Sequence, residues 1–273
     1  MKHDIEKAQL HFIKRESTNT PVINYSGYDE LQEYSDDYNF QEAEIFNART
    51  STDKEFSLDK EGFELVLFTP NDVDYLDQQA VKTTYYPEVE ALIKKHIGAT
   101  DVFAFDHTVR RGIEGSNRHP AYHIHNDYTH ETGSSRALST LGEDIINRFA
   151  GKRMVQINVW RSIAGVVQKD PLAFLDNQSL DEKDLVPAKI AFNDMKTGEK
   201  HNGEIFALKQ NPNQKWYFYP QMDSSEAVLI KGFDSDQNKS RFAMHTAFAL
   251  ANQHKNNTPR QSIETRTYAF FDE

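Results

Sequence analysis

The sequence predicts a mainly β protein with helices (α+β), built on a double-stranded β-helix, that is, a jelly-roll or cupin-like barrel flanked by helices. Three observations predict this fold. Short segments of strand character recur through the second half of the chain, and turn-formers such as Asn211-Pro212-Asn213 separate some of them. Helical periodicity is confined to the first half. No repeat, low-complexity tract or linker divides the 273 residues, which favours one domain over residues 1–273.

The first half of the chain is expected to contain an arm, two strands and two helices. Residues 1–60 are polar and are expected to form an irregular N-terminal arm with short strands, which leaves residues 61–273 for the jelly-roll core and its packing helices. Strands are expected at 63–68 and 102–107. A helix is expected from Pro87 to a stop at Gly98.

A second helix is expected over residues 134–150, with Gly151 as its stop. Its expected buried stripe consists of Leu138, Leu141, Ile145, Ile146 and Phe149. Further strands are expected at 154–160, 172–175, 188–192, 204–209, 216–219, 227–231, 242–249 and 262–271.

Composition excludes several classes of function. A formal charge of −11 argues against nucleic acid or an anionic membrane as the main partner, because both repel an acidic surface. The absence of cysteine excludes a thiolate nucleophile and any cysteine-ligated metal. The N-terminus lacks the apolar run of a signal peptide, and no apolar segment is long enough to span a bilayer. We therefore expect a cytoplasmic protein; its oligomeric state is not indicated.

The triplet His125-x-Asp127 is the first chemical signal, and it lies in a stretch expected to be extended. Alternate side chains of an extended strand share a face, so His125 and Asp127 project together. An imidazole and a carboxylate so placed supply two of the three ligands of a 2-His-1-carboxylate facial triad, the site of non-haem Fe(II) oxygenases. Such a triplet also occurs by chance, so its value depends on partners elsewhere.

Two later segments supply candidate partners. His245 is a polar residue in an otherwise apolar strand, where a hydrogen-bonded core histidine is the alternative. In the next strand Arg260, Ser262, Glu264 and Arg266 share one face. An arginine fork with a hydroxyl two residues away suits a carboxylate such as the distal one of 2-oxoglutarate. The alternative is a solvated face with a Glu264–Arg266 ion pair.

The ordered series H-x-D, later histidine and R-x-S resembles the Fe(II)- and 2-oxoglutarate-dependent dioxygenases, whose double-stranded β-helix carries these motifs in that order. The finer resemblance is to the hydroxylase/desaturase family of the fungal AsaB-like proteins, related to the accessory chain of the cephamycin 7α-methoxylase. It extends from Phe63 to the C-terminus. The segments that carry it are Tyr85-Tyr86-Pro87-Glu88-Val89, Phe105-Asp106-His107-Thr108-Val109-Arg110, His125-Asn126-Asp127-Tyr128-Thr129, Asn158-Val159-Trp160-Arg161, Trp216-Tyr217-Phe218-Tyr219-Pro220-Gln221-Met222, Lys231-Gly232-Phe233-Asp234-Ser235, Met244-His245-Thr246-Ala247-Phe248 and Arg260-Gln261-Ser262-Ile263-Glu264-Thr265-Arg266.

The resemblance implies the site residues and the cofactors. It implies His125, Asp127 and His245 as iron ligands. It implies Arg260 and Ser262 as the 2-oxoglutarate carboxylate site, with Arg266 as a substitute if the register is shifted. Fe(II), 2-oxoglutarate as co-substrate and O2 would then hydroxylate or desaturate a small molecule, expected to be a secondary metabolite. One departure is Ser162, where the family is expected to have proline.

Two other readings stay open at this stage. A non-catalytic or accessory β-barrel of the same family would bind a small molecule without chemistry, although an intact triad argues against it. A cupin-like isomerase or hydrolase is disfavoured by R-x-S. His123 shares a face with His125 but is interpreted as structural, and Asn158 and Trp160 either line the co-substrate cavity or are packed and hydrogen-bonded.

Overall fold

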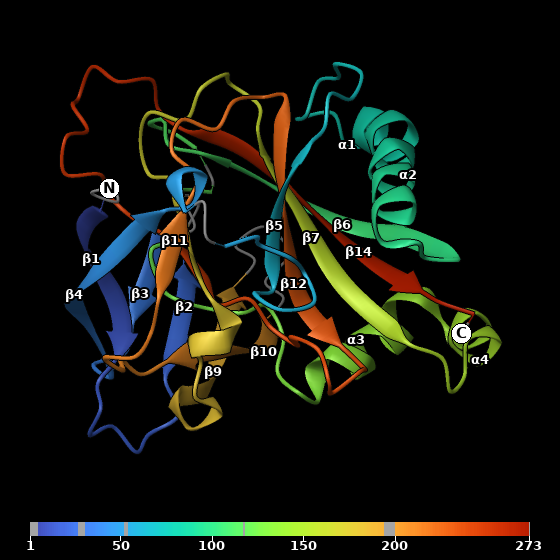
Figure 1. Ribbon diagram of the computed structural model, residues 1–273, viewed down its shortest axis with the longest axis horizontal. Helices are drawn as coiled ribbons and strands as arrows, with labels where there is room; N and C mark the ends of the chain where they lie inside the picture. The colour runs from blue at the N-terminus through green and yellow to red at the C-terminus, as the bar shows by residue number, and fades with distance from the viewer. Residues whose placement is uncertain (1–4, 27–30, 52–53, 117, 194–199, 273) are drawn as a thin grey trace.

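The computed structural model describes residues 5–26, 31–51, 54–116, 118–193 and 200–272, and a jelly roll with two walls forms its centre (Figure 1). The first wall is an antiparallel five-stranded sheet in the order β5-β12-β7-β14-β6. Its strands are β5 (Phe63–Leu67), β6 (Asp101–Arg111), β7 (Met154–Ser162), β12 (Glu226–Asp234) and β14 (Gln261–Phe270).

The second wall has the order β1-β4-β11-β8-β13. Its strands are β1 (Ile5–Ile13), β4 (Tyr38–Asn47), β8 (Leu172–Leu175), β11 (Trp216–Phe218) and β13 (His245–Ala247). A bridge between His125 and His245 adds an extended segment of the chain beyond β13. From β6 onward the chain passes back and forth between the walls, through this segment, β7, the pair β8 and β11 (both in the second wall), β12, β13 and β14. This alternation is the double-stranded β-helix that the sequence predicts.

A third sheet, in the order β10-β9-β2-β3, lies beside β1 and β4, away from the helices (Figure 1). Its strands are β2 (Val22–Ser26), β3 (Leu31–Tyr34), β9 (Leu185–Asn193) and β10 (Lys200–Leu208). The antiparallel β9 and β10 are inserted in the chain between β8 and β11, and β2 pairs with β9 in parallel. The inserted strands are thus joined to the N-terminal strands by β2, and to the jelly roll by a bridge between Phe206 of β10 and Asn126.

The expectation of an irregular arm at residues 1–60 was wrong. The described part of this region contributes β1 and β4, which pair along their whole length and extend the second wall through the parallel contact of β4 with β11. The strands are inconspicuous in sequence because one face is solvated and charged: Lys7 forms ion pairs with Glu42 at 3.5 Å and Glu44 at 3.6 Å. The other face contributes Leu10, Phe12 and Ile45 to a buried cluster.

The two helices that follow β6 pack against Tyr268 and Phe270, on the inner-facing side of β14 at its C-terminal end. The helices that precede β6 pack on the outer face of the first wall, on the other side of β14 and β6 (Figure 1). β7 shows why this face is apolar: its alternate residues Ile157 and Val159 pack against Val89 and Ile93 of α2, while Trp160 points to the interior between the walls. The helical elements are α1 (Gln78–Ala80), a π-helical turn (Val81–Tyr85), α2 (Tyr86–Ile97), α3 (Thr132–Leu141), α4 (Glu143–Arg148) and three short 3-10 turns (Ala48–Thr50, Asn177–Ser179, Glu182–Asp184). None of the described helices has the length and apolar character needed to cross a membrane.

The expectation of a single helix over residues 134–150 was wrong in two respects. Gly142 has φ +83° and ψ 166°, outside the helical region, and divides the segment into α3 and α4. Leu138, expected in the buried stripe, is 45% exposed. The face that packs on the sheet instead carries Ala137 and Gly133, whose missing side chain allows Phe233 to approach closely.

Candidate metal centre

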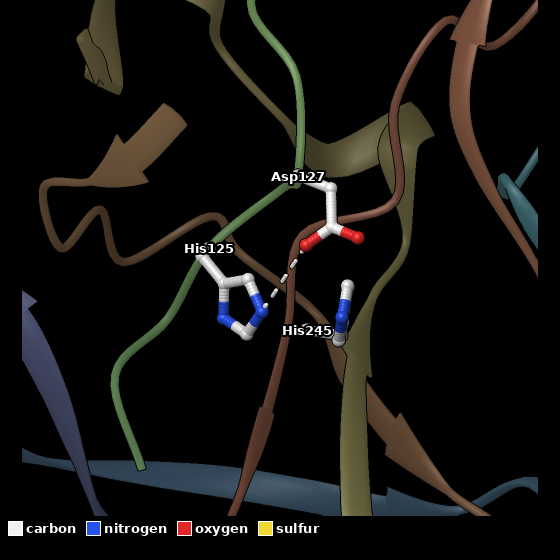
Figure 2. A group of neighbouring side chains, drawn as sticks. All are labelled: His125, Asp127 and His245. Atoms are coloured by element: carbon white, nitrogen blue, oxygen red, sulfur yellow. Dashed lines mark ion pairs between the residues drawn. The ribbon is translucent and has the colours of Figure 1, made fainter. Parts of the chain in front are cut away.

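His125, Asp127 and His245 converge on one point inside the jelly roll, at the edge of the second wall (Figure 2). The potential ligand atoms of the three side chains all lie within 4.8 Å of one another. His125 and Asp127 come from the segment between β6 and α3, and His245 begins β13. Among the described residues this is the one group of three or more such side chains close enough to hold a metal ion.

A pair of backbone hydrogen bonds brings the two histidines together. The amide of His125 donates to the carbonyl of His245 at 3.0 Å, and the amide of His245 donates to that of His125 at 2.9 Å. Residues paired in this way in antiparallel strands lie directly opposite and face the same side. The imidazole centroids are consequently 4.5 Å apart. The segment of His125 has only isolated bridges, so the strand expected there is an extended stretch held by single pairs.

Both histidines have their Nδ1 atoms turned away from the common point. His125 Nδ1 donates to the carbonyl of His123 at 2.9 Å, and His245 Nδ1 donates to the carbonyl of Ala243 at 2.8 Å. A carbonyl oxygen only accepts, so these bonds place the proton on Nδ1 and leave the Nε2 lone pair for a metal. Burial, together with the nearby His245, lowers the pKa of His125 to about 3, which keeps that imidazole neutral near pH 7.

The carboxylate of Asp127 is held through one of its two oxygens. Oδ2 accepts from Arg266 Nε at 2.8 Å and from Asn158 Nδ2 at 3.0 Å. Oδ1 lies on the other side, 3.6 Å from His125 Nε2. Burial alone would raise the pKa of Asp127, but the positive charge of Arg266 outweighs it and holds that pKa well below its usual range. The site therefore offers an anionic oxygen beside the Nε2 atoms of two imidazoles.

The two arginines of the R-x-S region have different surroundings. Arg266 makes further contacts with Glu264, Asp106 and Thr108, so its guanidinium is engaged with protein side chains. Arg260 is 2% exposed and its Nη1 donates to the carbonyl of Asp170. Among the described residues no carboxylate forms an ion pair with Arg260, and its buried Nε has no hydrogen-bond acceptor.

The surroundings of Arg260 suit an anionic ligand. A buried guanidinium that forms no ion pair is unfavourable unless something negative binds to it. Burial lowers the pKa of Arg260 to about 10, although the negative charges of Asp170 and Glu264 act against this fall. The guanidinium lies 5.5 Å from the centroid of the Trp160 ring. Ser262 is also buried, and it lies opposite Arg110 of β6 and Ser162 of β7.

Arg110 was not singled out from the sequence. Its positive charge contributes to lowering the pKa of both His125 and Arg260, so it lies near the candidate metal centre and near the unpaired arginine. Asp106, Thr108 and Arg110 alternate along β6 onto one face, and this period would have revealed them. They were missed because the strand was expected to end at residue 107, whereas β6 continues to Arg111.

The remaining sequence candidates are in structural positions. His123 is buried and stacks near His125, with a ring-centroid distance of 4.4 Å, but it does not belong to the group of converging ligand atoms. His107 contacts the Tyr86 hydroxyl at 2.8 Å, and His130 accepts from Arg241 at 2.8 Å. Ser162, the departure from the family pattern, donates to the carbonyl of Gly165.

Comparison with known proteins gives concordant matches. The model of a family described as "Oxidoreductase/YMDC permease-like domain" matches residues 10–270. The hydroxylase/desaturase efuI of Hormonema carpetanum is 30% identical, over 86% of this chain and 85% of that protein. The Fe(II)/2-oxoglutarate-dependent dioxygenase nvfI of Aspergillus novofumigatus is 30% identical, over 82% and 81%.

Solved structures show the same fold. A structure of the iron and alpha-ketoglutarate-dependent endoperoxidase NvfI superposes with a TM-score of 0.82 at 24% identity, covering 98% of this chain and 99% of that one. A second structure of NvfI, in a different conformation, gives a TM-score of 0.83 at 23% identity and covers both chains fully. The whole jelly roll, including the N-terminal strands, is therefore shared.

Proposed function

Because this chain belongs to the oxidoreductase family that includes the fungal hydroxylase/desaturases and Fe(II)/2-oxoglutarate-dependent dioxygenases, we propose that it is a non-haem iron oxygenase that hydroxylates or desaturates a small molecule, expected to be a secondary metabolite. The single observation that carries the proposal is the convergence of His125, Asp127 and His245. The donor set is two imidazoles and one carboxylate, which is the set that Fe(II) oxygenases use.

The donor atoms fit Fe(II) in their protonation as well as in their type. Each imidazole has its Nδ1 proton held by a carbonyl, so Nε2 is oriented toward the common point before any metal arrives. The Oδ1 of Asp127 faces the same point with a negative charge. In the proposal His125, Asp127 and His245 hold the iron, and the positions left open take 2-oxoglutarate and O2.

Arg260 and Ser262 are proposed to hold the far carboxylate of 2-oxoglutarate. The support is the buried and unpaired guanidinium of Arg260, with the Ser262 side chain on the same strand face. Arg110 adds a second positive charge near this position and near His125. Arg266, the substitute considered from sequence, is already surrounded by carboxylates, so it is assigned no part in binding 2-oxoglutarate.

When bound, Fe(II) with 2-oxoglutarate and O2 supplies an oxidant that removes hydrogen from the substrate, while 2-oxoglutarate is converted to succinate and carbon dioxide. The task of this chain is to hold and orient the groups. The carbonyls of His123 and Ala243 fix the tautomers of the histidines, and Arg260 orients the keto acid by its far end. No acid or base from the protein is required.

Anaerobic addition of Fe(II) and 2-oxoglutarate tests the proposal, because a keto acid chelated to Fe(II) produces a visible charge-transfer band. We expect the band in the wild-type protein and not in His245→Ala. His254→Ala is the matched control, since it removes an exposed histidine from a loop and should retain the band. A second readout is release of succinate in air without substrate.

Two outcomes would overturn the proposal. Absence of the band in the wild-type protein would favour a non-catalytic barrel of the same family. Persistence of the band in His245→Ala would place the metal elsewhere. The band of Arg260→Met can also be titrated with 2-oxoglutarate. If it develops over the same concentrations as in the wild-type protein, only the assignment of Arg260 is overturned.

A further inference from the structure

We propose that Arg266 and Asn158 are positioning residues that restrict Asp127 to binding the metal through Oδ1 alone; the inference rests on the proposed metal centre. Both side chains donate to the same oxygen, Oδ2, at 2.8 and 3.0 Å. An ionised carboxylate has about two lone-pair directions on each oxygen, so two good donors satisfy Oδ2. Its partner oxygen Oδ1 is then the one available for a cation.

Asn158 can donate to Asp127 in only one orientation of its amide. Its Oδ1 accepts from Gln156 Nε2 at 2.6 Å, so its Nδ2 must face Asp127. Gln156 and Asn158 alternate along β7 and share a face. The bond from Gln156 therefore fixes the amide orientation in which Asn158 donates to Asp127.

Arg266 is fixed on the sides that do not face Asp127. Its Nη2 donates to Glu264 at 2.7 Å, and its Nη1 donates to Asp106 at 3.1 Å and to Thr108 at 3.0 Å. Every nitrogen of the guanidinium thus has a protein acceptor, and its planar fork leaves little freedom to rotate. These bonds engage four of the five guanidinium N–H groups.

Strand register explains how these partners come together. Arg266 of β14 is paired with Asn158 of β7 on one side and with Asp106 of β6 on the other. Three neighbouring strands therefore present one row of side chains to the wall that carries Asp127. The row is a rigid support for the carboxylate, because each member belongs to a paired strand.

The consequence concerns the number of open positions on the metal. A carboxylate that binds through both oxygens would take up a position that the keto acid or O2 needs. Occupation of Oδ2 by Arg266 and Asn158 prevents this binding mode. The positive charge of Arg266 also balances Asp127 when no metal is present, so the empty site does not carry an isolated buried anion.

Co(II), bound without oxygen, is the probe for the test, because its visible spectrum reports both occupancy and coordination. We expect the Co(II) dissociation constant to rise about 10-fold in Asn158→Ala and about 100-fold in Arg266→Met, as for other residues that support metal ligands. The spectrum should also change shape. Arg161→Met is the matched control: it removes a buried arginine of the same sheet that contacts Tyr75 at 2.6 Å on the other face, and it should leave the Co(II) spectrum unchanged.

The outcomes separate this inference from the metal site itself. An Asn158→Ala protein with wild-type Co(II) affinity and spectrum would overturn the positioning role. If Arg266→Met does not fold, Asn158→Ala and Asn158→Leu still decide the question, since they remove one uncharged donor. Failure of the wild-type protein to bind Co(II), or equal binding by His125→Ala, would instead overturn the proposed metal centre.

Discussion

Arg260, which is buried just before β14, and Arg266, which is partly buried within β14, are in opposite electrostatic situations. Arg266 forms ion pairs with Asp106, Asp127 and Glu264. Arg260 instead donates to a backbone carbonyl and lies over an aromatic ring, and it forms no ion pair with a carboxylate of the described residues. Burial disfavours the charged form of both guanidinium groups and by itself would lower the pKa of each. Neighbouring carboxylates outweigh it at Arg266, where the pKa rises well above its ordinary value, and do not at Arg260, where the pKa falls to about 10.

The difference separates two uses of arginine. The charge of Arg266 is balanced by carboxylates of the protein, as expected for a residue that supports a metal ligand. Arg260 forms no such ion pair, as expected for a residue that binds a ligand with its own negative charge. Sequence alternation alone treats the two as interchangeable, because positions 260 and 266 are an even number of residues apart and would share a face of one strand. The contacts across the neighbouring strands distinguish them.

Removing each arginine from the metal-free protein should give the largest difference. Arg266→Met leaves the buried carboxylates of Asp127 and Glu264 without a counter-ion, so we expect the free energy of unfolding to fall by about 3–5 kcal/mol. Arg260→Met replaces an unpaired charge by an apolar side chain, so the free energy should stay within about 1 kcal/mol of wild type or increase. Urea denaturation measures both, and equal losses would contradict the comparison.

A smaller effect is expected on the stabilisation of the protein by bound 2-oxoglutarate, and it should be specific to Arg260. With Co(II) bound and 2-oxoglutarate at about 100 times its wild-type dissociation constant, the co-substrate should stabilise the wild-type protein by about 2.7 kcal/mol. In Arg260→Met this stabilisation should fall below about 0.5 kcal/mol, because the far carboxylate loses its cation. Arg161→Met serves as the control and should retain the full effect. Unaltered stabilisation in Arg260→Met would assign the carboxylate to another residue, with Arg110 the next to be substituted.

The smallest effect is expected at the hydroxyl beside Arg260. Ser262→Ala removes one hydrogen bond to a charged group, worth about 1.5 kcal/mol, so the dissociation constant of 2-oxoglutarate should rise about 10-fold. Ser162→Ala is a close control on the neighbouring strand, since the Ser162 hydroxyl donates to the Gly165 carbonyl at 2.6 Å. Calorimetric titration measures both variants. Similar losses in the two would indicate a general effect on the sheet.

The alternation of residues along a strand was sufficient to predict those parts of the site whose residues are close together in the sequence. The two-residue period placed His125 and Asp127 on one side of an extended segment, and their side chains do converge. The same period placed Arg260, Ser262, Glu264 and Arg266 on one strand face. The Glu264–Arg266 contact, considered only as a bland alternative, is present at 2.7 Å. Such short-range relations follow from backbone geometry, which any strand shares.

Distant relations required the folded chain. That His245 lies opposite His125 depends on one pair of backbone hydrogen bonds across the edge of the second wall. The strands β1 and β4 were missed because their polar face is solvated and their apolar face is recognisable only against the wall they extend. Gly142 was read as part of a helix that it interrupts.

By itself, the sequence determined the β-rich fold, the H-x-D triplet and the order of the later histidine and R-x-S, because these depend on periodicity and chain order. Only the tertiary structure decided which arginine supports Asp127 and which remains unpaired. The reason is physical: the state of a buried charge is set by the groups packed around it, and Asp106, Asn158 and Asp127 reach Arg266 from three different segments of the chain.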